Sequence, residues 1–467
     1  MTITDRSESF LYRRLADELA EAIRSGVYRA GDKLPSLRHF CRQHAVSLST
    51  ALQVYRSLEE AQLVESRPKS GYFVLPRGCG EACEPAMSRP STAPRKVTSA
   101  QLAIDILNEA RRPELINLGA VVPSLSNLPL KSLSRITSGL VRRSPELLGR
   151  YERPDGNELL RTRLVRRLRE DGCDCDSEEI IITNGCQEAI VLSLRAVAKP
   201  GDVIAIESPT FYGILQAIES LGMKALEIPT HPRHGVDLDS LQRIVDQGKV
   251  AACLFIPSFN NPLGSCMPLE NRKRLANMLA RARLPLIEDD VYGDLSFQQP
   301  RLPTVKSFDR EGNVMLCSSF SKTLVPGYRI GYVLAGKWSD KLRHLKLLGN
   351  VATAGLPQMA LAEYLKRGGY EKVIGEAART YRWRIEQIRS QVLKYFPEGT
   401  LVTQPQGGFV LWVEMPPEVD CVVLHDRALQ AGISVTPGII FSPHGDYHHH
   451  LRISCGQLPT DNAEPAI

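Results

Sequence analysis

The stretch SSFSKTLVPGYRIG, residues 318–331, says most about the fold of this chain. It follows an apolar run that is typical of a strand, and it places Lys322 among hydroxyl side chains, with Arg329 further along. A lysine amine can condense with an aldehyde, and Ser319, Ser321 and Arg329 can hold a phosphate dianion beside it. Taken alone, the pattern is weak and favours an ordinary loop lysine.

Motifs on both sides of the lysine carry groups that could hold a phosphorylated aromatic aldehyde, although each motif is common by itself. Asp289 ends a predicted strand, and a carboxylate there can keep a pyridine nitrogen protonated, which makes the ring an electron sink. Tyr292 and Asn261 can bond a phenolic oxygen of the same ring. The turn at Gly185 opens a helix after a strand, so its free backbone N–H groups can bind a phosphate. Near the C-terminal end, Arg452 offers a guanidinium fork for a carboxylate.

A basic stretch near the N-terminus predicts a second function. Residues 33–58 carry four Lys or Arg side chains and no acid, and their apolar spacing predicts two short helices joined by a turn. A surface of one sign attracts phosphates, and this one coincides with a helix–turn–helix pattern. Side chains placed to reach DNA bases or an adjacent groove are Ser47, Ser49, Thr50, Gln53, Arg67 and Lys69. On charge alone, a small helical interaction domain with a solvated basic face fits equally well.

Length and composition limit the classes of protein. The 467 residues are 43% hydrophobic and 24% charged, which excludes a disordered or membrane-spanning chain and predicts about two or three folded domains. The first residues are polar, so we expect a cytoplasmic protein that does not enter a membrane. The net charge of +6 is only mildly basic, and the 11 scattered cysteines favour free thiols over disulfides or a metal site.

Changes of pattern along the chain predict its domains. Residues 1–75 read as three helices and a hairpin, and the proline-rich stretch 76–112 reads as a linker. From there, short apolar runs alternate with helical stretches over 113–348, which predicts a large α/β domain with a mostly parallel sheet. Residues 349–467 predict a smaller α+β domain.

The N-terminal motifs resemble a known family. GDKLPSLR at 31–38, VYRSL at 54–58 and KSGYFV at 69–74 are similar to the winged helix–turn–helix of GntR-type bacterial regulators. The resemblance implies that DNA contacts Arg38, the helix at residues 47–56, which ends at Arg56, and the wing at residues 67–71. Leu48 departs from the family, in which a polar or basic residue is common early in the recognition helix.

The C-terminal motifs, in their order, resemble those of fold-type I pyridoxal phosphate (PLP) aminotransferases. The resemblance implies an internal aldimine at Lys322, with Asp289 at the pyridine nitrogen, Asn261 and Tyr292 at the phenolic oxygen, and Phe211 stacked on the ring. The implied phosphate cradle consists of Gly185, Cys186, Gln187, Ser319, Ser321 and Arg329, completed by Tyr151 of a neighbouring subunit. Arg452 would bind an α-carboxylate. Cys186 departs from the family, because a small hydroxyl residue is common there.

Together, the two halves resemble the MocR family of bacterial transcriptional regulators. The resemblance implies a mostly helical winged helix–turn–helix joined to an α/β fold-type I aminotransferase domain. It further implies a homodimer in the cytoplasm, at the nucleoid, that binds double-stranded operator DNA and senses an amino acid or amine through aldimine exchange at Lys322. An active aminotransferase with a DNA-binding appendage is the main alternative, since Lys322, Asp289 and Arg452 are all present; a scaffold that has lost its cofactor is another.

Overall fold

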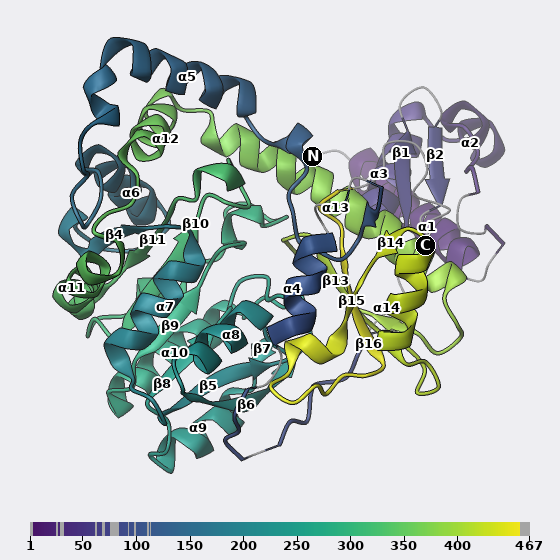
Figure 1. Cartoon of the computed structure of the whole chain (residues 1–467). Coiled ribbons are helices and arrows are strands. Elements are labelled where there is room, and N and C mark those ends of the chain that lie inside the picture. Colours follow the sequence, from purple (N-terminus) through teal and green to yellow (C-terminus); the bar gives the residue numbers. More distant parts are fainter. Residues whose placement is uncertain are drawn as a thin grey trace. The chain divides into compact units, whose positions relative to one another are not determined.

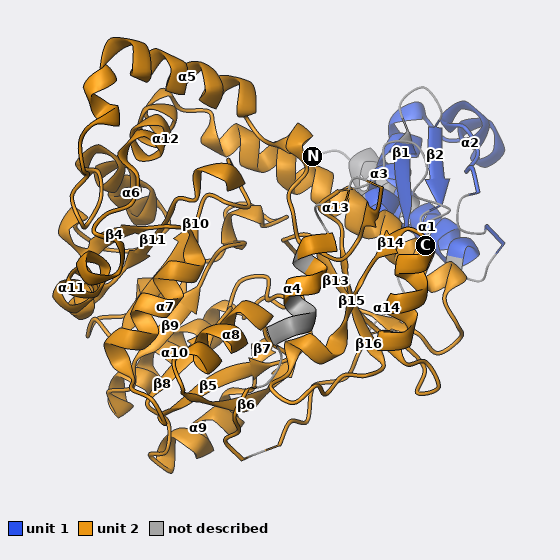
Figure 2. Ribbon diagram, in the orientation of Figure 1, with its two compact units in different colours: residues 1–82 blue, residues 83–467 orange. Residues whose placement is uncertain are grey.

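The computed structural model of the chain describes residues 3–24, 27–28, 32–60, 63–67, 71–74, 84–91, 93–97, 100–109, 112 and 114–457. The chain divides into two compact units, residues 1–82 and residues 83–467, which Figure 2 shows in different colours. No helix among the described residues is long and apolar enough to span a membrane.

The smaller unit has three helices and a β-hairpin, as predicted for a winged helix–turn–helix. Its elements are α1 (Ile3–Arg24), α2 (Leu37–His44), α3 (Leu48–Glu60), β1 (Val64–Arg67) and β2 (Gly71–Val74). The two strands are antiparallel, and Lys33 adds a bridge to Phe73 on the other edge of β2. One core joins all these elements, since Leu19, Phe40, Val54 and Val74 belong to the same buried cluster.

Local capping determines where the helices of this unit begin and end. Ser36 caps α2, because its hydroxyl accepts a hydrogen bond from the N–H of His39 at 3.3 Å. The helix ends at Ala45, whose backbone is left-handed with a φ of 51°. Ser47 then accepts from the N–H of Thr50 at 3.1 Å and begins α3. The buried Tyr55 donates to the carbonyl of Pro35 at 2.7 Å, which holds α3 against the start of α2.

The larger unit is built on an eight-stranded sheet in the order β4-β11-β10-β9-β8-β5-β6-β7. The strands are β4 (Ile180–Thr183), β5 (Val203–Ser208), β6 (Lys224–His231), β7 (Gly235–Val236), β8 (Ala252–Phe255), β9 (Leu286–Asp289), β10 (Val314–Ser319) and β11 (Gly331–Leu334). Neighbours from β10 to β6 are parallel, whereas β11 runs antiparallel to both β10 and β4. The predicted fold-type I architecture, with its mostly parallel sheet, is confirmed.

Both faces of this sheet are covered. Ile180 and Ile182 belong to one buried cluster, and Ile181 between them belongs to another, so successive side chains of β4 enter cores on opposite faces. The covering helices, which Figure 1 shows around the sheet, are α5 (Leu130–Arg143), α6 (Glu158–Glu170), α7 (Cys186–Val197), α8 (Tyr212–Ser220), α9 (Leu238–Asp246), α10 (Leu269–Ala282), α11 (Ser339–Asn350) and α12 (Gly355–Arg367).

The C-terminal part has its own antiparallel sheet, in the order β12-β13-β16-β15. Its strands are β12 (Leu401–Val402), β13 (Val410–Glu414), β15 (Thr436–Pro437) and β16 (His450–Ser454), and its helices are α13 (Tyr370–Tyr395) and α14 (Cys421–Gln430). A short strand near the start of the larger unit, β3 (Ile116–Asn117), pairs with β14 (Ile433–Ser434). The segment around β3 is therefore attached to the C-terminal part of this unit.

Much of the stretch predicted as a linker is attached to the larger unit. Arg95 exchanges two backbone hydrogen bonds with Ala225 of β6, at 2.9 and 3.0 Å, and α4 (Ala100–Glu109) follows it. This edge of β6 is open there because β7 pairs only with Thr230 and His231. A free strand edge readily hydrogen-bonds to another chain segment, and here the segment at residues 93–97 binds to it.

Two glycines with similar backbone angles provide a test of the packing near β4. Gly156 has a φ of +94°, and a Cβ there would lie 2.3 Å from Cγ1 of Ile182, whereas Gly201 has a φ of +91° with nothing within 4 Å. We expect Gly201→Ala to lower the free energy of unfolding by about 1 kcal/mol through backbone strain alone. Gly156→Ala should cost about 3 kcal/mol, because overpacking is added to strain. Denaturant unfolding of the full chain measures both, and equal costs would contradict the packing argument.

Candidate functional site

Neighbouring strands bring the predicted site residues to one edge of the sheet. Asp289 ends β9 and lies opposite Cys317 of the parallel strand β10, which ends two residues later at Ser319. Ser319 pairs with Gly331, and Gly331 pairs with Thr183 at the end of β4. The carboxyl edge of an open α/β sheet is where such folds bind ligands.

Lys322 lies just beyond β10 and is only partly exposed. Its Nζ donates to the carbonyl of Val121 at 2.5 Å and lies 5.9 Å from the ring centre of Tyr292. Burial lowers the pKa of this amine to about 8, with Arg452 and Arg329 adding to the shift and Asp289 opposing it. The amine therefore loses its proton more readily than an exposed lysine does, as a nucleophile requires.

Asp289 is buried, and no lysine or arginine in the described part of the chain forms an ion pair with it. Its carboxylate accepts from the N–H of Val291 at 3.2 Å and from the thiol of Cys186 at 3.4 Å. Burial raises the pKa of Asp289 to about 6. A buried acid without a counter-charge fits a position beside a cationic ring nitrogen.

Cys186 stands where the family often has a hydroxyl, and it faces Asp289. Burial raises the pKa of its thiol well above the usual range, so the sulfur remains a protonated donor. The substitution therefore places a weak hydrogen bond on the carboxylate expected at the pyridine nitrogen.

The start of α7 and Arg329 lie together and offer groups that suit a phosphate. Gly185 precedes the helix without a side-chain cap, which leaves N–H groups of the first turn for a ligand. A Cβ at Gly185 would lie 2.4 Å from Nη2 of Arg329, so only glycine lets the guanidinium lie against the turn. Arg329 also donates to Ser321 at 3.1 Å. The side-chain amide of Gln187 donates to the carbonyl of Gly213 at 2.6 Å, so the backbone N–H of Gln187 is the group left to bind a phosphate.

Asn261 and Tyr292 are both buried at the same edge. Burial raises the pKa of Tyr292 well above its ordinary value, while the contact with Asn261 opposes the shift, so the phenol stays protonated and can donate to an anionic oxygen. Phe211 immediately precedes α8 and is half-buried, with its ring centre 4.5 Å from that of Tyr212. Asn261 and Tyr292 can hold a phenolic oxygen, Asp289 can pair with a pyridine nitrogen, and Phe211 can stack on an aromatic ring. These groups match the parts of a pyridoxal phosphate ring.

Arg452, in the middle of β16, is fully buried and no carboxylate among the described residues is paired with it. Nη1 donates to Asn261 at 3.1 Å, and Nη2 donates to Thr436 at 3.0 Å and to the carbonyl of Gly119. Its Nε has no hydrogen-bond partner among the residues that the structure describes. A buried cation held only by neutral acceptors is costly unless an anion joins it, so the site fits a ligand carboxylate.

Comparisons with known proteins agree with both halves of the chain. Residues 113–467 match the model of the class I and II aminotransferases, and residues 11–74 match that of the gntR family of bacterial regulatory proteins. The uncharacterized HTH-type transcriptional regulators YjiR and YdcR of Escherichia coli are 36% and 34% identical to it, over 95% and 98% of this chain and 94% and 97% of their own. The crystal structure of LysN, an α-aminoadipate aminotransferase of Thermus thermophilus complexed with N-(5'-phosphopyridoxyl)-L-leucine, covers 79% of this chain and 92% of its own, with 27% identity and a TM-score of 0.73.

This chain belongs to the MocR-type transcriptional regulators. Its N-terminal unit is a GntR-type DNA-binding domain, and its larger unit is an aminotransferase-like domain whose cofactor is PLP. The buried acid, the uncapped helix start and the lysine with a lowered pKa are the features of this structure that fit that cofactor.

In the DNA-binding unit of this MocR-type regulator, most of the predicted contact residues are exposed. Arg38, Ser47, Ser49, Gln53 and Arg56 all face solvent, as does Leu48. The prediction that Thr50 is exposed is wrong: Thr50 is buried, and its hydroxyl lies 2.7 Å from that of Ser47 at the helix cap. The side chain of Arg67 and the whole of Lys69 lie outside the described residues.

Tyr151 is not part of the site within one chain. Its side chain is 92% exposed, and the nearby Leu148 and Leu159 are 65% and 61% exposed. A tyrosine that contacts the phosphate of a second MocR-type subunit must be exposed on its own chain, as Tyr151 is. Its exposure agrees with the predicted role, which stays a prediction.

Some parts of the site were not found from the sequence. The carbonyls of Val121 and Gly119, which hold Lys322 and Arg452, carry no side-chain signal. Phe441 lies with its ring centre 5.1 Å from the guanidinium of Arg452. In the sequence it is only part of a short apolar run, which gives no signal of a place in the site.

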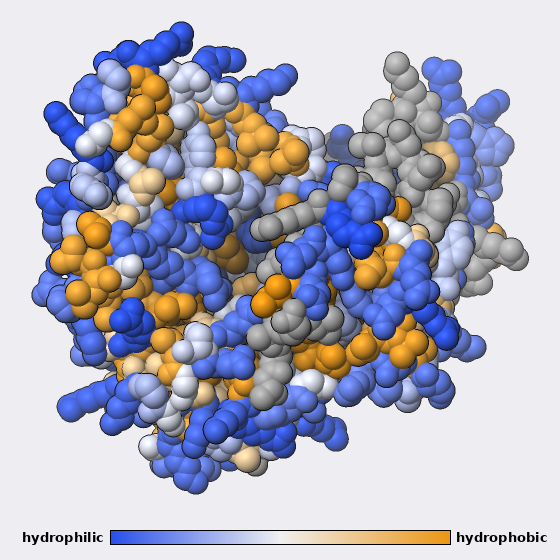
Figure 3. Space-filling model, viewed as in Figure 1, coloured by the Kyte–Doolittle hydropathy of each residue, from blue (hydrophilic) through white to orange (hydrophobic). Residues whose placement is uncertain are grey.

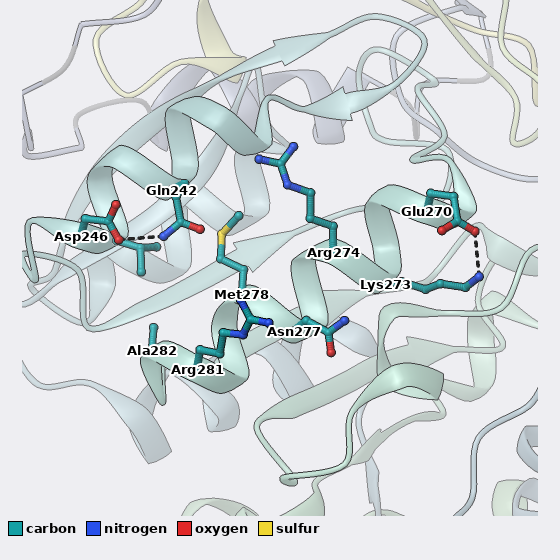
Figure 4. Close-up of a pocket in the computed structure, with 10 residues that line it drawn as sticks. Gln242, Asp246, Glu270, Lys273, Arg274, Asn277, Met278, Arg281 and Ala282 are labelled. Atoms are coloured by element: carbon teal, nitrogen blue, oxygen red, sulfur yellow. Dashed lines mark hydrogen bonds and ion pairs between the residues drawn. The ribbon is translucent and has the colours of Figure 1, made fainter.

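A separate open groove of the MocR-type regulator lies between α9 and α10, and Figure 4 shows the side chains that line it. Gln242 bonds Asp246 and Lys273 bonds Glu270, each at 2.7 Å. None of the predicted site residues lines it, so we assign no chemistry to this groove.

The lowered pKa of Lys322 gives a prediction for the cofactor-free chain. Since the neutral amine is the nucleophile, acylation of Lys322 should have a pH midpoint of about 8. Arg452→Met removes a positive charge and should raise that midpoint, so that less Lys322 reacts at pH 8. Pulse labelling followed by mass spectrometry of the Lys322 peptide measures both, with the exposed Lys341 as the internal reference. An unchanged midpoint in the variant would show that Arg452 does not act on this amine.

Proposed function

We propose that this transcriptional regulator responds to an amino acid or amine that binds between Lys322 and Arg452. The observation that carries the proposal is the buried guanidinium of Arg452, which is held only by neutral acceptors in the described part of the chain. Asn261 contacts it and lies beside Tyr292 at the expected position of the cofactor ring. An effector carboxylate at Arg452 would neutralise the positive charge of the guanidinium, which the described residues leave uncompensated.

The proposed roles of the other residues follow from their surroundings. When bound, PLP supplies an aldehyde carbon that can be bonded either to the Lys322 amine or to the amine of an effector. Asp289 would keep the ring nitrogen protonated, and Asn261 and Tyr292 would hold the phenolic oxygen. Phe211 would stack on the ring. The phosphate would be held by Gly185, Cys186, Gln187, Ser319, Ser321 and Arg329.

The helix α4 offers a route from the effector site toward the DNA-binding unit. Ile106 of α4 is fully buried in one cluster with Tyr212 and with Phe441, the ring beside Arg452. At its end, the carboxylate of Glu109 accepts from the hydroxyl of Ser434 at 2.6 Å. The helix α4 therefore packs on α8, one of the helices that cover the large sheet. It is also hydrogen-bonded to the C-terminal part.

The segment before α4 is fastened to both parts in the same manner. Ser88 exchanges hydrogen bonds with Thr230 of β6, and the carboxylate of Glu84 accepts from Arg233 and, at 2.7 Å, from the N–H of Gln404. An effector that changes the spacing between the two sheets would change how this segment is held. Such a difference in binding energy between two states is what a ligand needs to shift operator affinity.

A homodimer is part of the proposal. Exposed apolar side chains gather on α6, α11 and the turn before Tyr151, namely Leu148, Leu159, Leu347, Leu348 and Val351. Figure 3 shows apolar surface over this side of the larger unit. A second copy would cover it and would bring its Tyr151 to the phosphate. Two DNA-reading units per dimer would then bind paired operator half-sites in the cytoplasm, at the nucleoid.

Amino transfer is a second candidate activity. The amine of Lys322, the acid of Asp289 and the guanidinium of Arg452 are the groups such a reaction uses, and all three lie at one site. Formation of an oxo acid during the effector titration described next would reveal it.

The effector site is tested with matched pairs of amino acids and the amines that lack their carboxylate. Because a buried guanidinium recognises the carboxylate, the PLP-loaded chain should bind the responding amino acid about 30-fold more tightly than its amine, or about 2 kcal/mol. Arg452→Met should abolish this preference, and Arg427→Met, at an exposed position of α14, should keep it. Absorbance of the bound cofactor reports binding. If neither class of compound changes the spectrum, the proposed function is wrong.

The DNA face is tested at Arg38. Arg38→Ala removes one phosphate contact, so it should weaken binding to operator DNA and reduce the slope of log affinity against log salt by about one. Arg14→Ala serves as the control, because Arg14 is an exposed residue of α1 that is paired with Glu18. Fluorescence anisotropy at several salt concentrations measures the slope. Equal slopes for both variants would contradict the assigned face.

A further inference from the structure

Lys346 is a fully buried lysine that the proposed function does not use. It lies on α11, and its Nζ donates to Oε2 of Glu188 at 2.6 Å and to the hydroxyl of Thr353 at 2.8 Å. Burial lowers the pKa of this amine, and the carboxylate of Glu188 opposes that shift. A buried ammonium is costly to keep, so its position beside one carboxylate calls for an explanation.

Glu188 lies in the first turn of α7, at the proposed phosphate cradle. Its Oε2 accepts from the N–H of Asn184 at 2.5 Å, and its Oε1 accepts from the side-chain amide of Asn350 at 2.5 Å. The carbonyl of Asn184 in turn accepts from Arg329 at 3.4 Å. Glu188 therefore holds the turn that carries Gly185, and through that turn it reaches the arginine of the cradle.

The negative charge of Glu188 is unfavourable beside a bound phosphate. An acid in the first turn of a helix normally interacts well with the helix dipole. A phosphate dianion bound at the same helix start would be repelled by it. Lys346 neutralises Glu188 from the side away from solvent, since Lys346 is 0% exposed and Glu188 is 21% exposed at its side chain.

We propose that Glu188 and Lys346 act together as positioning residues of the phosphate cradle, with Glu188 fixing the Asn184–Gly185 turn and Lys346 cancelling its charge. The inference rests on the proposed cradle and concerns the phosphate of the cofactor alone. It makes the pair asymmetric, because loss of Lys346 exposes a phosphate to an uncompensated carboxylate, whereas loss of the charge on Glu188 does not.

The test compares PLP with pyridoxal, which has the same ring and aldehyde but no phosphate. In the full chain, Lys346→Met should raise the dissociation constant of PLP about tenfold and leave that of pyridoxal unchanged. Glu188→Gln keeps the acceptor for Asn184 without the charge, so PLP should bind as tightly as in the wild type or more tightly. The double variant Lys346→Met/Glu188→Gln should return to within about twofold of the wild type. Spectral titration of the cofactor-free chains gives all the constants.

Lys341→Met is the matched control, since Lys341 is an exposed residue of the same helix and its loss should change neither constant. A merely structural pair would weaken PLP and pyridoxal alike, and the double variant would not recover; either result overturns the inference. If Lys346→Met does not fold, Glu188→Gln still decides, because weaker PLP binding in that variant contradicts the charge argument. A wild-type chain that binds PLP no better than pyridoxal would instead remove the proposed cradle itself.

Discussion

The buried guanidinium of Arg452 is the interaction on which the rest of the site depends. Its acceptors come from three separate places: Asn261 follows strand β8 of the large sheet, Thr436 belongs to the C-terminal sheet, and Gly119 lies just after β3. Neutral acceptors offset only part of the desolvation cost of a buried charge. The same cation therefore draws three parts of the chain together, and in the proposed function an anion would complete its set of partners.

This arrangement explains how a small ligand can have a distant effect. In the proposed function, an anion at Arg452 would compete with the neutral acceptors, and it would thereby change how firmly the two sheets are held to each other. The ring of Phe441 lies beside the guanidinium and shares a buried cluster with Ile106 of α4. Because packed clusters tend to rearrange as a unit, a change at the arginine would, in this proposal, also alter the packing of α4.

The sequence allowed the fold class and much of the site to be predicted, because these depend on local signals. Strand ends place Asp289 and Ser319, and Ser36 and Ser47 cap the helices of the N-terminal unit. Other features depend on contacts between distant residues. The attachment of Arg95 to β6 follows from an edge that β7 leaves open, and Thr50 is buried because its hydroxyl turns back to the helix cap. Backbone acceptors such as Val121 carry no pattern at all.

The way α4 is held bears on the choice between a regulator and an enzyme, since both would need the same reactive groups. An aminotransferase requires only that Lys322, Asp289 and Arg452 meet at one edge of the sheet. It does not require the preceding segment to be bonded on both sides, as Glu84 is to Arg233 and Gln404. In the proposed function, such double attachment would make this segment sensitive to the spacing between the sheets. The chemistry of the site is thus shared with enzymes, and in the proposed regulator it is the attachment of this segment that would pass occupancy of the site on to the unit that binds DNA.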